Sequence, residues 1–235
     1  MTRRRWIADE VSGNCAALTG EHARHLSQVL RAQVGQEFDI STGTEVRHGR
    51  VTNIQADRVE FELGEIVVYA ATPPITVALS IFKFDRMEWA IEKCTELGVA
   101  RIIPVIAART ESHLTTSASK RVERWQRIAK QASEQARRVS PPEISAPIKF
   151  KDLLAMSGSP RIVLSETEQN VLLKDAIPGD AHSLLLAFGA EGGWKEEEII
   201  AFREAGWTSA SLGNTILRAE TAVIAAVAIA CSILE

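Results

Sequence analysis

Short apolar runs alternate with helical patterns along the last two thirds of the chain. The runs predict buried strands at 75–82, 101–106, 161–165, 183–188 and 209–212. After the first run, Asp85 is suited to cap a helix in which Met87 and Ile91 share one face. A further helix is predicted over 195–205. Strands that alternate with helices indicate an α/β fold with a mostly parallel sheet.

The first 72 residues show a different, β-rich pattern. The predicted elements are a helix at 22–31, a strand at 37–40, a turn at 42–44 and strands at 46–54 and 59–63. Pro73 and Pro74 then disfavour the continuation of helix or sheet, which predicts a linker at 70–74. We therefore predict two domains, 1–72 and 73–235.

The predicted C-terminal helix, 220–234, is apolar on almost every side between Ala222 and Ile233. It is too short to cross a bilayer, which takes about 20 apolar residues, so no membrane span is expected. A helix that is apolar all round must be buried against something. A second subunit is the expected cover, and the sequence therefore predicts a homodimer.

Composition is that of an ordinary globular protein, with 46% hydrophobic and 24% charged residues among 235. Cys15, Cys94 and Cys231 form no C-x-x-C pair and are odd in number, so neither a zinc site nor a disulfide framework is indicated. No metal is expected. The basic N-terminus runs into Asp9 and Glu10 without an apolar signal core, and we predict a cytoplasmic location.

The net charge of −3 hides an uneven distribution. Residues 1–72 sum to −2, residues 73–150 to +5 and residues 151–235 to −6. Few acids accompany the basic residues between 120 and 138, a pattern that favours binding to nucleic-acid phosphates. The alternative is a solvated helix face with pairs such as Glu123 with Arg127. The candidate RNA-binding residues here are Lys120, Arg121, Arg124, Arg127 and Arg138.

Two segments rich in glycine follow predicted strands near the C-terminus. The first glycine segment covers 189–194 and the second covers 212–222. Loops at the carboxyl ends of strands bind ligands in open α/β sheets, and glycine lets a ligand lie against backbone. Neither segment has the spacing of a P-loop or of G-x-G-x-x-G. Glu191 would repel a phosphate, so a cationic or neutral ligand is expected; the alternative is that Gly192 and Gly193 only form a tight turn.

These two segments, G-A-E-G-G and L-G-N-T-I-L-R-A-E-T-A, resemble signatures of a known family. They are similar to the G-P-E-G-G and L-G-x-R-I-L-R-x-E-T-A motifs of the 16S ribosomal RNA uridine-N3 methyltransferases of the SPOUT superfamily. The chain departs from the motifs at Ala190 and Thr215. Agreement in order extends over most of the chain, through Lys83, Met87-Glu88, 93–99, Pro104, Trp125, Ile128, 134–138 and 142–144.

The resemblance implies a fold and an assembly. The expected architecture is a small PUA-like, RNA-binding β-barrel domain at 1–72, followed by a trefoil-knotted SPOUT methyltransferase domain at 73–235 that works as a dimer. Arg31 matches an arginine of the PUA-like module, although an arginine at a helix end also suits the helix dipole. It joins the candidate RNA-binding residues.

The resemblance also implies a cofactor, S-adenosyl-L-methionine, and the residues that contact it. The expected contacts are Gly189, Glu191, Gly192, Gly193, Leu212, Gly213, Ile216 and Leu217, with Leu164 and Phe188 at the ends of the neighbouring strands. Arg138 and Arg218 lie in matched motifs as candidate catalytic cations. Each could instead form an ion pair with Glu220 or another acid. No histidine lies in a signature, so the sequence suggests no general base.

The expected function is methylation of N3 of a specific uridine in 16S rRNA, with the small ribosomal subunit as partner. N3 of uridine is protonated at neutral pH, so the reaction needs a base or cations that stabilise the anion. Two alternatives remain at this level. One is a SPOUT enzyme that acts on another RNA, such as tRNA or 23S rRNA; the other is a noncatalytic RNA-binding module.

Overall fold

A computed structural model describes residues 5–68, 74–158 and 160–234. The chain divides into two compact units. The first comprises Met1–Ala71 with Ser133–Ser140, and the second comprises Thr72–Ala132 with Pro141–Glu235. The predicted linker falls largely on 69–73, outside the described residues, as do Arg3 and Arg4 of the basic N-terminus.

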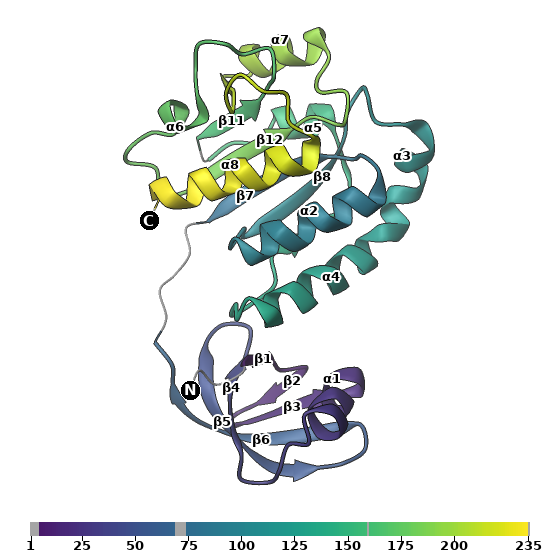
Figure 1. Cartoon of the computed structure of the whole chain (residues 1–235), viewed down its shortest axis with the longest axis vertical. Coiled ribbons are helices and arrows are strands. Elements are labelled where there is room, and N and C mark those ends of the chain that lie inside the picture. The colour runs from purple at the N-terminus through teal and green to yellow at the C-terminus, as the bar shows by residue number, and fades with distance from the viewer. Residues whose placement is uncertain (1–4, 69–73, 159, 235) are drawn as a thin grey trace. The chain divides into compact units, whose positions relative to one another are not determined.

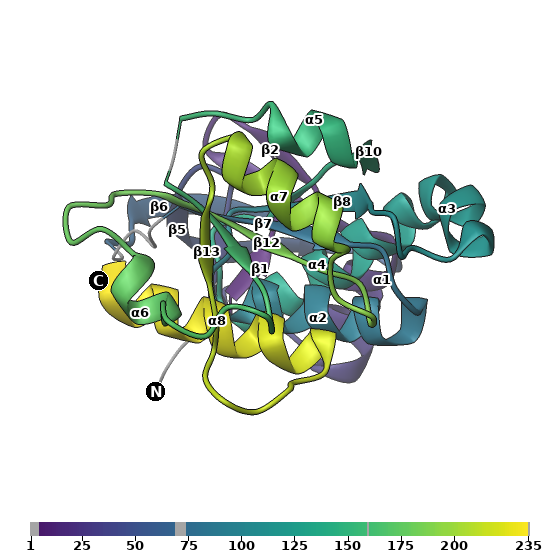
Figure 2. The same ribbon diagram turned by 90° about the horizontal axis from the view of Figure 1, so that it is seen from above.

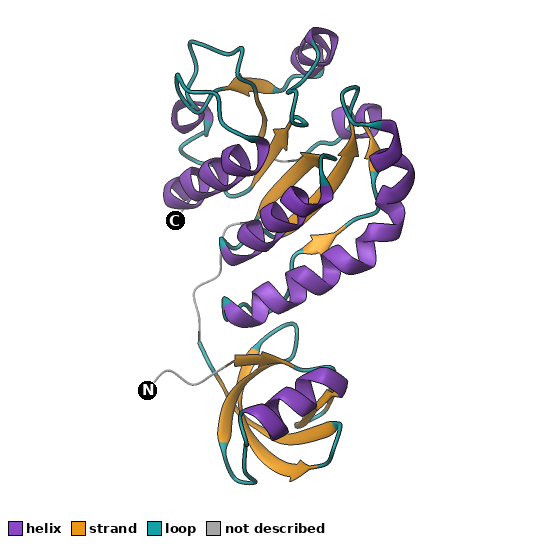
Figure 3. Cartoon of the chain, turned by 45° about the vertical axis from the view of Figure 1, so that its right-hand side comes forward, coloured by secondary structure: helices purple, strands orange, loops and turns teal. Residues whose placement is uncertain are grey.

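The first unit is built around a curled sheet, which fits the small PUA-like β domain predicted at 1–72 (Figure 3). Its strands are β1 (Arg5–Ile7), β2 (Glu10–Ser12), β3 (Cys15–Thr19), β4 (Glu37–Ser41), β5 (Val46–Ile54) and β6 (Arg58–Ile66), in the order β1-β4-β5-β6-β3-β2. β1 pairs with β4 in parallel and the other neighbours are antiparallel. The core includes Trp6, Leu18, Ile40 and Phe61.

The helix predicted at 22–31 begins earlier and ends earlier than expected. It consists of α1 (Gly20–Arg24) and a π-helical stretch, η1 (His25–Val29). Arg31 lies beyond the helix with a positive φ of 52° and an exposed side chain, so the expectation that it closes the helix is wrong. The left-handed backbone ends helical hydrogen bonding at this point.

A parallel sheet forms the centre of the second unit and confirms the predicted α/β fold (Figure 1). Its main strands run in the order β10-β8-β7-β12-β11-β13, and β9 also pairs with β8. All the pairings between these strands are parallel. The strands are β7 (Ile75–Ser80), β8 (Arg101–Ile106), β9 (Glu143–Ile144), β10 (Ile148–Lys149), β11 (Arg161–Leu164), β12 (Leu184–Phe188) and β13 (Thr208–Ala210).

Helices cover both faces of this sheet (Figure 2). They are α2 (Phe84–Glu96), α3 (Ser112–Ala118), η2 (Ser119–Arg121), α4 (Val122–Gln135), α5 (Phe150–Leu154), α6 (Leu173–Ala176), α7 (Glu196–Glu204) and α8 (Ala219–Leu234). Val77 of β7 packs in the cluster that includes α2 and α8, whereas Ala78 packs on the side of α5 and α7. Burial on both faces explains why the strands read as continuous apolar runs.

The helix after β7 begins one residue before the cap predicted for it. α2 starts at Phe84, and Lys83 occupies the N-cap position without a side-chain capping bond. Asp85 therefore lies in the first turn, and its prediction as N-cap is wrong. A carboxylate in the first turn still interacts favourably with the helix dipole.

The C-terminal helix α8 confirms the helix predicted at 220–234 and is covered on one side within the chain. Val223, Val227 and Ala230 are buried, and α8 packs against α2 and the sheet. The opposite side includes Ala228, which is exposed, and Ile233, which is 38% exposed. Among the described residues, no helix combines the length and apolar character needed to cross a membrane. The knot and the dimer stay predictions.

We expect the exposed side of α8 to be buried in a homodimer, so that light scattering at micromolar concentration reports about twice the chain mass. Ala228→Glu should shift the population to monomer, because it would place a charge in that interface while Ala228 is exposed within one chain. Ile200→Glu on the exposed side of α7 is the matched control and should leave the mass unchanged. A wild-type monomer would contradict the prediction.

Candidate functional site

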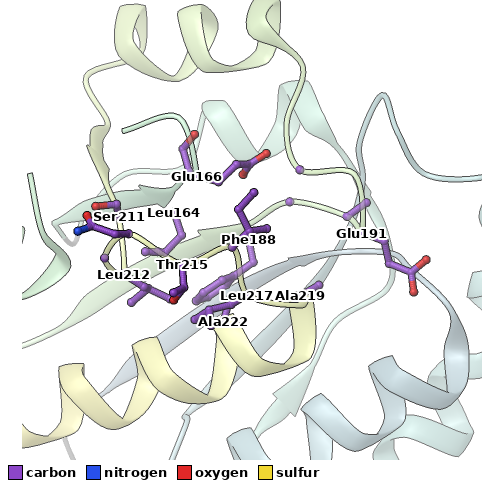
Figure 4. A pocket seen from close by; sticks show the side chains of 17 residues that line it. Leu164, Glu166, Phe188, Glu191, Ser211, Leu212, Thr215, Leu217, Ala219 and Ala222 are labelled. Carbon is purple, nitrogen blue, oxygen red and sulfur yellow. The ribbon is translucent and has the colours of Figure 1, made fainter. Parts of the chain in front are cut away.

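The two glycine segments meet at one edge of the parallel sheet and line a common pocket (Figure 4). The first follows β12 and the second follows β13, while β11 lies between these two strands and pairs with both. Because the three strands are parallel, their carboxyl ends and the loops that follow them lie at the same edge. The strand order therefore brings together segments that are separate in the sequence.

The pocket collects most of the residues predicted to contact a cofactor. Ser165, Glu166, Ala190, Ser211, Asn214, Thr215, Ala219 and Ala222 line it, together with predicted residues. The predicted residues among its lining are Leu164, Phe188, Gly189, Glu191, Gly193, Leu212, Gly213, Ile216 and Leu217. Gly192 lies outside the described lining, and its carbonyl oxygen accepts a hydrogen bond from Nη1 of Arg109.

Gly189 and Gly193 are required by the backbone of the first glycine segment. A Cβ on Gly189 would lie 2.8 Å from the carbonyl carbon of Gly193, closer than backbone atoms permit. Gly193 has a φ of +69°, and a Cβ there would overlap the carboxylate of Glu166. The Gly193 amide also donates to the Ala190 carbonyl at 2.8 Å. The tight turn suggested as an alternative is thus present, and the same turn forms one wall of the pocket.

The charge of Glu191 is balanced from outside the pocket. Its Oε1 lies 2.6 Å from Nη1 of Arg86, and its Oε2 lies 3.8 Å from Nζ of Lys83. Figure 4 shows its carboxylate directed away from the other labelled side chains. Glu191 is therefore engaged with the start of α2, and the repulsion of phosphate expected from it is largely offset.

Arg86 also lies next to the start of α8. Its Nε is 4.0 Å from Oε1 of Glu220, a carboxylate that is only 5% exposed. Within the described residues Glu220 is therefore approached by Arg86, and the catalytic role of Arg218 stays a prediction. Arg218 is exposed, and within the described ranges it forms no ion pair. The guanidinium of Arg218 thus remains available at a position flanked by the pocket residues Leu217 and Ala219.

Sequence reasoning missed three side chains of this site: Arg86, Arg109 and Glu166. Each lies close after the carboxyl end of a strand, of β7, β8 and β11 respectively, which is the signal that could have found them. Glu166 lines the pocket, and across the residues that the structure describes its carboxylate has no hydrogen bond or ion pair. Arg86 and Arg109 hold the first glycine segment from outside.

The predicted basic surface is partly neutralised by an acid from another helix. Arg124 of α4 forms a bidentate pair with Glu88 of α2, with N–O distances of 2.6 and 2.7 Å. Nη1 of Arg121 lies 3.7 Å from the same carboxylate. Lys120 and Arg127 are exposed and have no ion pair in the described part of the chain. They are the stronger candidates for a phosphate contact.

Arg138 and Arg31 belong to the first unit, whereas the pocket lies in the second. Arg138 is not among the described residues that line the pocket. Burial lowers the pKa of Arg138 below the usual value for a guanidinium. Desolvation disfavours the charged form of the guanidinium, and a nearby anionic group would stabilise that charged form.

The fold and the pocket define a class: an α/β RNA methyltransferase with an accessory RNA-binding domain. A model of the RNA methyltransferase domain matches residues 70–231, and a model of the RNA methyltransferase PUA domain matches residues 18–64. The chain belongs to the ribosomal RNA small subunit methyltransferase E family.

Members of that family are similar to this chain over most of their length. Ribosomal RNA small subunit methyltransferase E of Synechocystis is 31% identical, with 93% of this chain and 73% of the relative covered. The Bacillus subtilis protein of the same name is 32% identical, with 88% and 85% covered. The crystal structure of the Neisseria gonorrhoeae protein bound to S-adenosyl methionine has a TM-score of 0.86 and 31% identity, with 97% and 96% covered.

We expect Gly193→Val to abolish binding of S-adenosylmethionine while most of the fold persists. A β-branched residue resists the positive φ, and its side chain would displace Glu166 from the wall of the pocket. Calorimetry on the folded variant measures the affinity, and Gly158→Val, at another positive φ with open space around it, is the control. Unchanged affinity of Gly193→Val would remove the first glycine segment from the cofactor site.

Proposed function

We propose that this protein transfers a methyl group from S-adenosyl-L-methionine to N3 of a specific uridine in 16S rRNA of the small ribosomal subunit. The observation that carries the proposal is the pocket formed jointly by the two glycine segments, each of which matches a signature of the uridine-N3 methyltransferases. Family membership supports RNA methylation as the reaction class. A protein that methylates ribosomal RNA is expected in the cytoplasm, where the small subunit is found.

The lining of the pocket fits this cofactor. Leu164, Phe188 and Leu217 offer apolar surface for an adenine ring, and the glycines open the backbone to a ligand. The described lining holds no lysine or arginine, the side chains that most often pair with a phosphate, so its chemistry suits a ligand without phosphate. Once bound, the sulfonium supplies an activated methyl group, so the protein's task is to orient the acceptor for in-line displacement.

The acceptor nitrogen is the chemical difficulty. N3 of uridine must lose its proton, and cations near O2 and O4 would stabilise the resulting anion. Arg218 suits this role because its guanidinium is exposed beside the pocket and has no ion pair within the described residues. Arg138 keeps the role proposed for it from the sequence, either as a second cation or as a phosphate contact.

Methylation of defined RNAs tests the proposal directly. The purified protein is incubated with labelled S-adenosylmethionine and either naked 16S rRNA, assembled small subunits, 23S rRNA or tRNA, and the product nucleoside is identified by mass spectrometry. We expect 3-methyluridine in 16S rRNA or in the small subunit. A methylated ribose or a product only in tRNA or 23S rRNA would replace the proposed substrate, and no product with any RNA would favour a noncatalytic module.

RNA binding should depend on Lys120 and Arg127 of the second unit, which have no ion pair within the described residues. We expect Lys120→Ala with Arg127→Ala to weaken RNA binding across sequences and to flatten its salt dependence, because each lost phosphate contact lowers the logarithmic slope by about one. Arg124→Ala should have a smaller effect, since Arg124 is engaged with Glu88. Filter binding over a salt series measures both quantities.

Cofactor affinity provides the control for these variants and should not change. If Lys120 and Arg127 prove neutral while Arg124→Ala weakens binding, the ion pair with Glu88 must open on RNA binding. If all three are neutral, the RNA surface lies elsewhere, and the first unit around Arg31 becomes the place to examine.

A further inference from the structure

Two carboxylates line the pocket, within the described residues, and their surroundings differ. Glu191 is neutralised by Arg86 at 2.6 Å and approached by Lys83 at 3.8 Å. Glu166 has neither a hydrogen bond nor an ion pair among the residues that the structure describes. The uncompensated negative charge of the pocket therefore comes from Glu166.

The position of Glu166 follows from the strand order. β11 lies between β12 and β13, so the loop after β11 emerges between the two glycine segments. Ser165 is buried, its Oγ accepts a hydrogen bond from the Thr167 amide at 3.2 Å, and this turn fixes the backbone on either side of Glu166. Figure 4 shows the Glu166 side chain above Phe188 at the wall of the pocket.

The first glycine segment leaves room for this carboxylate. The space that a Cβ on Gly193 would occupy is filled by the carboxylate of Glu166, with its Oε2 2.9 Å from that point. Glycine at this position therefore has two effects: it allows a positive φ, and it leaves space for the carboxylate of a neighbouring loop. The guanidinium groups of Arg86 and Arg109, which contact this segment, bind Glu191 and the Gly192 carbonyl instead of Glu166.

We propose that Glu166 pairs with a cationic group of the bound S-adenosyl compound and thereby selects a cationic ligand over a neutral nucleoside. The inference rests on the proposed function, because it assigns a residue of the same pocket. Two cationic groups of S-adenosylmethionine fit this chemistry, the sulfonium and the α-ammonium. A charge-assisted contact of this kind is stronger than a neutral hydrogen bond, and it gains further when the ligand excludes water.

Calorimetry with three ligands tests the assignment. S-adenosylmethionine carries both cations, S-adenosylhomocysteine keeps only the α-ammonium, and 5′-methylthioadenosine has neither. Glu166→Gln keeps the size of the side chain and removes its charge. We expect this variant to bind S-adenosylmethionine about tenfold more weakly, while its affinity for 5′-methylthioadenosine stays within about twofold of wild type.

The matched control is Glu197→Gln, which removes a charge from the first turn of α7 at an exposed position outside the described lining. It should leave all three affinities unchanged, and thermal unfolding of both variants checks that they are folded. A loss confined to S-adenosylmethionine supports pairing with the sulfonium. A loss shared with S-adenosylhomocysteine supports pairing with the α-ammonium.

Two results would overturn the inference while leaving the proposed function intact. One is unchanged binding of S-adenosylmethionine by Glu166→Gln. The other is an equal loss for all three ligands, which would show that Glu166 contacts the ribose or only supports the backbone at Gly193. Absence of S-adenosylmethionine binding by the wild-type protein would instead overturn the proposed function, and this inference with it.

Discussion

The parallel pairing of β11 with both β12 and β13 is the constraint on which the site depends. It places the carboxyl ends of three strands side by side, so that three loops converge on one pocket. The strands can hold this arrangement because helices bury both faces of the sheet, with Val77 and Ala78 of β7 facing opposite cores. The close packing of helices on both faces of the sheet therefore fixes the strand ends, and with them the positions of the loops that line the pocket.

Arginines outside the pocket neutralise the carboxylate of the first glycine segment and fix the position of its backbone. Arg86 connects the segment to the start of α2 through Glu191 and also approaches the buried Glu220 of α8. Arg109 contacts the segment from the loop after β8. A loop held from two sides needs less reordering when a ligand binds, which favours affinity. The glycines allow the backbone conformation of this segment, and the contacts of Arg86 and Arg109 stabilise it.

Periodicity in the sequence predicted the elements that are long or buried on both faces. β7, β8, β11, β12 and β13 of the parallel sheet and the last helix were visible in this way, because burial imposes a continuous apolar pattern. β1, β2, β3, β9 and β10 were not predicted; β1, β2, β9 and β10 have at most three residues each, and β2 is exposed throughout. The N-cap of α2 was predicted two residues too late, at Asp85 instead of Lys83, because first-turn acids and N-caps share the same residue types.

By itself, the sequence determined the α/β class, the glycine segments, the resemblance to a methyltransferase family and most residues of the pocket, because these follow from patterns within short stretches of chain. Only the tertiary structure decided which charges meet. Glu88 reaches Arg124, Arg86 reaches Glu191, and Glu166 lies against Gly193. Each contact joins segments far apart in the sequence, and their adjacency is set by strand order and helix packing, which local hydrophobic patterns do not encode.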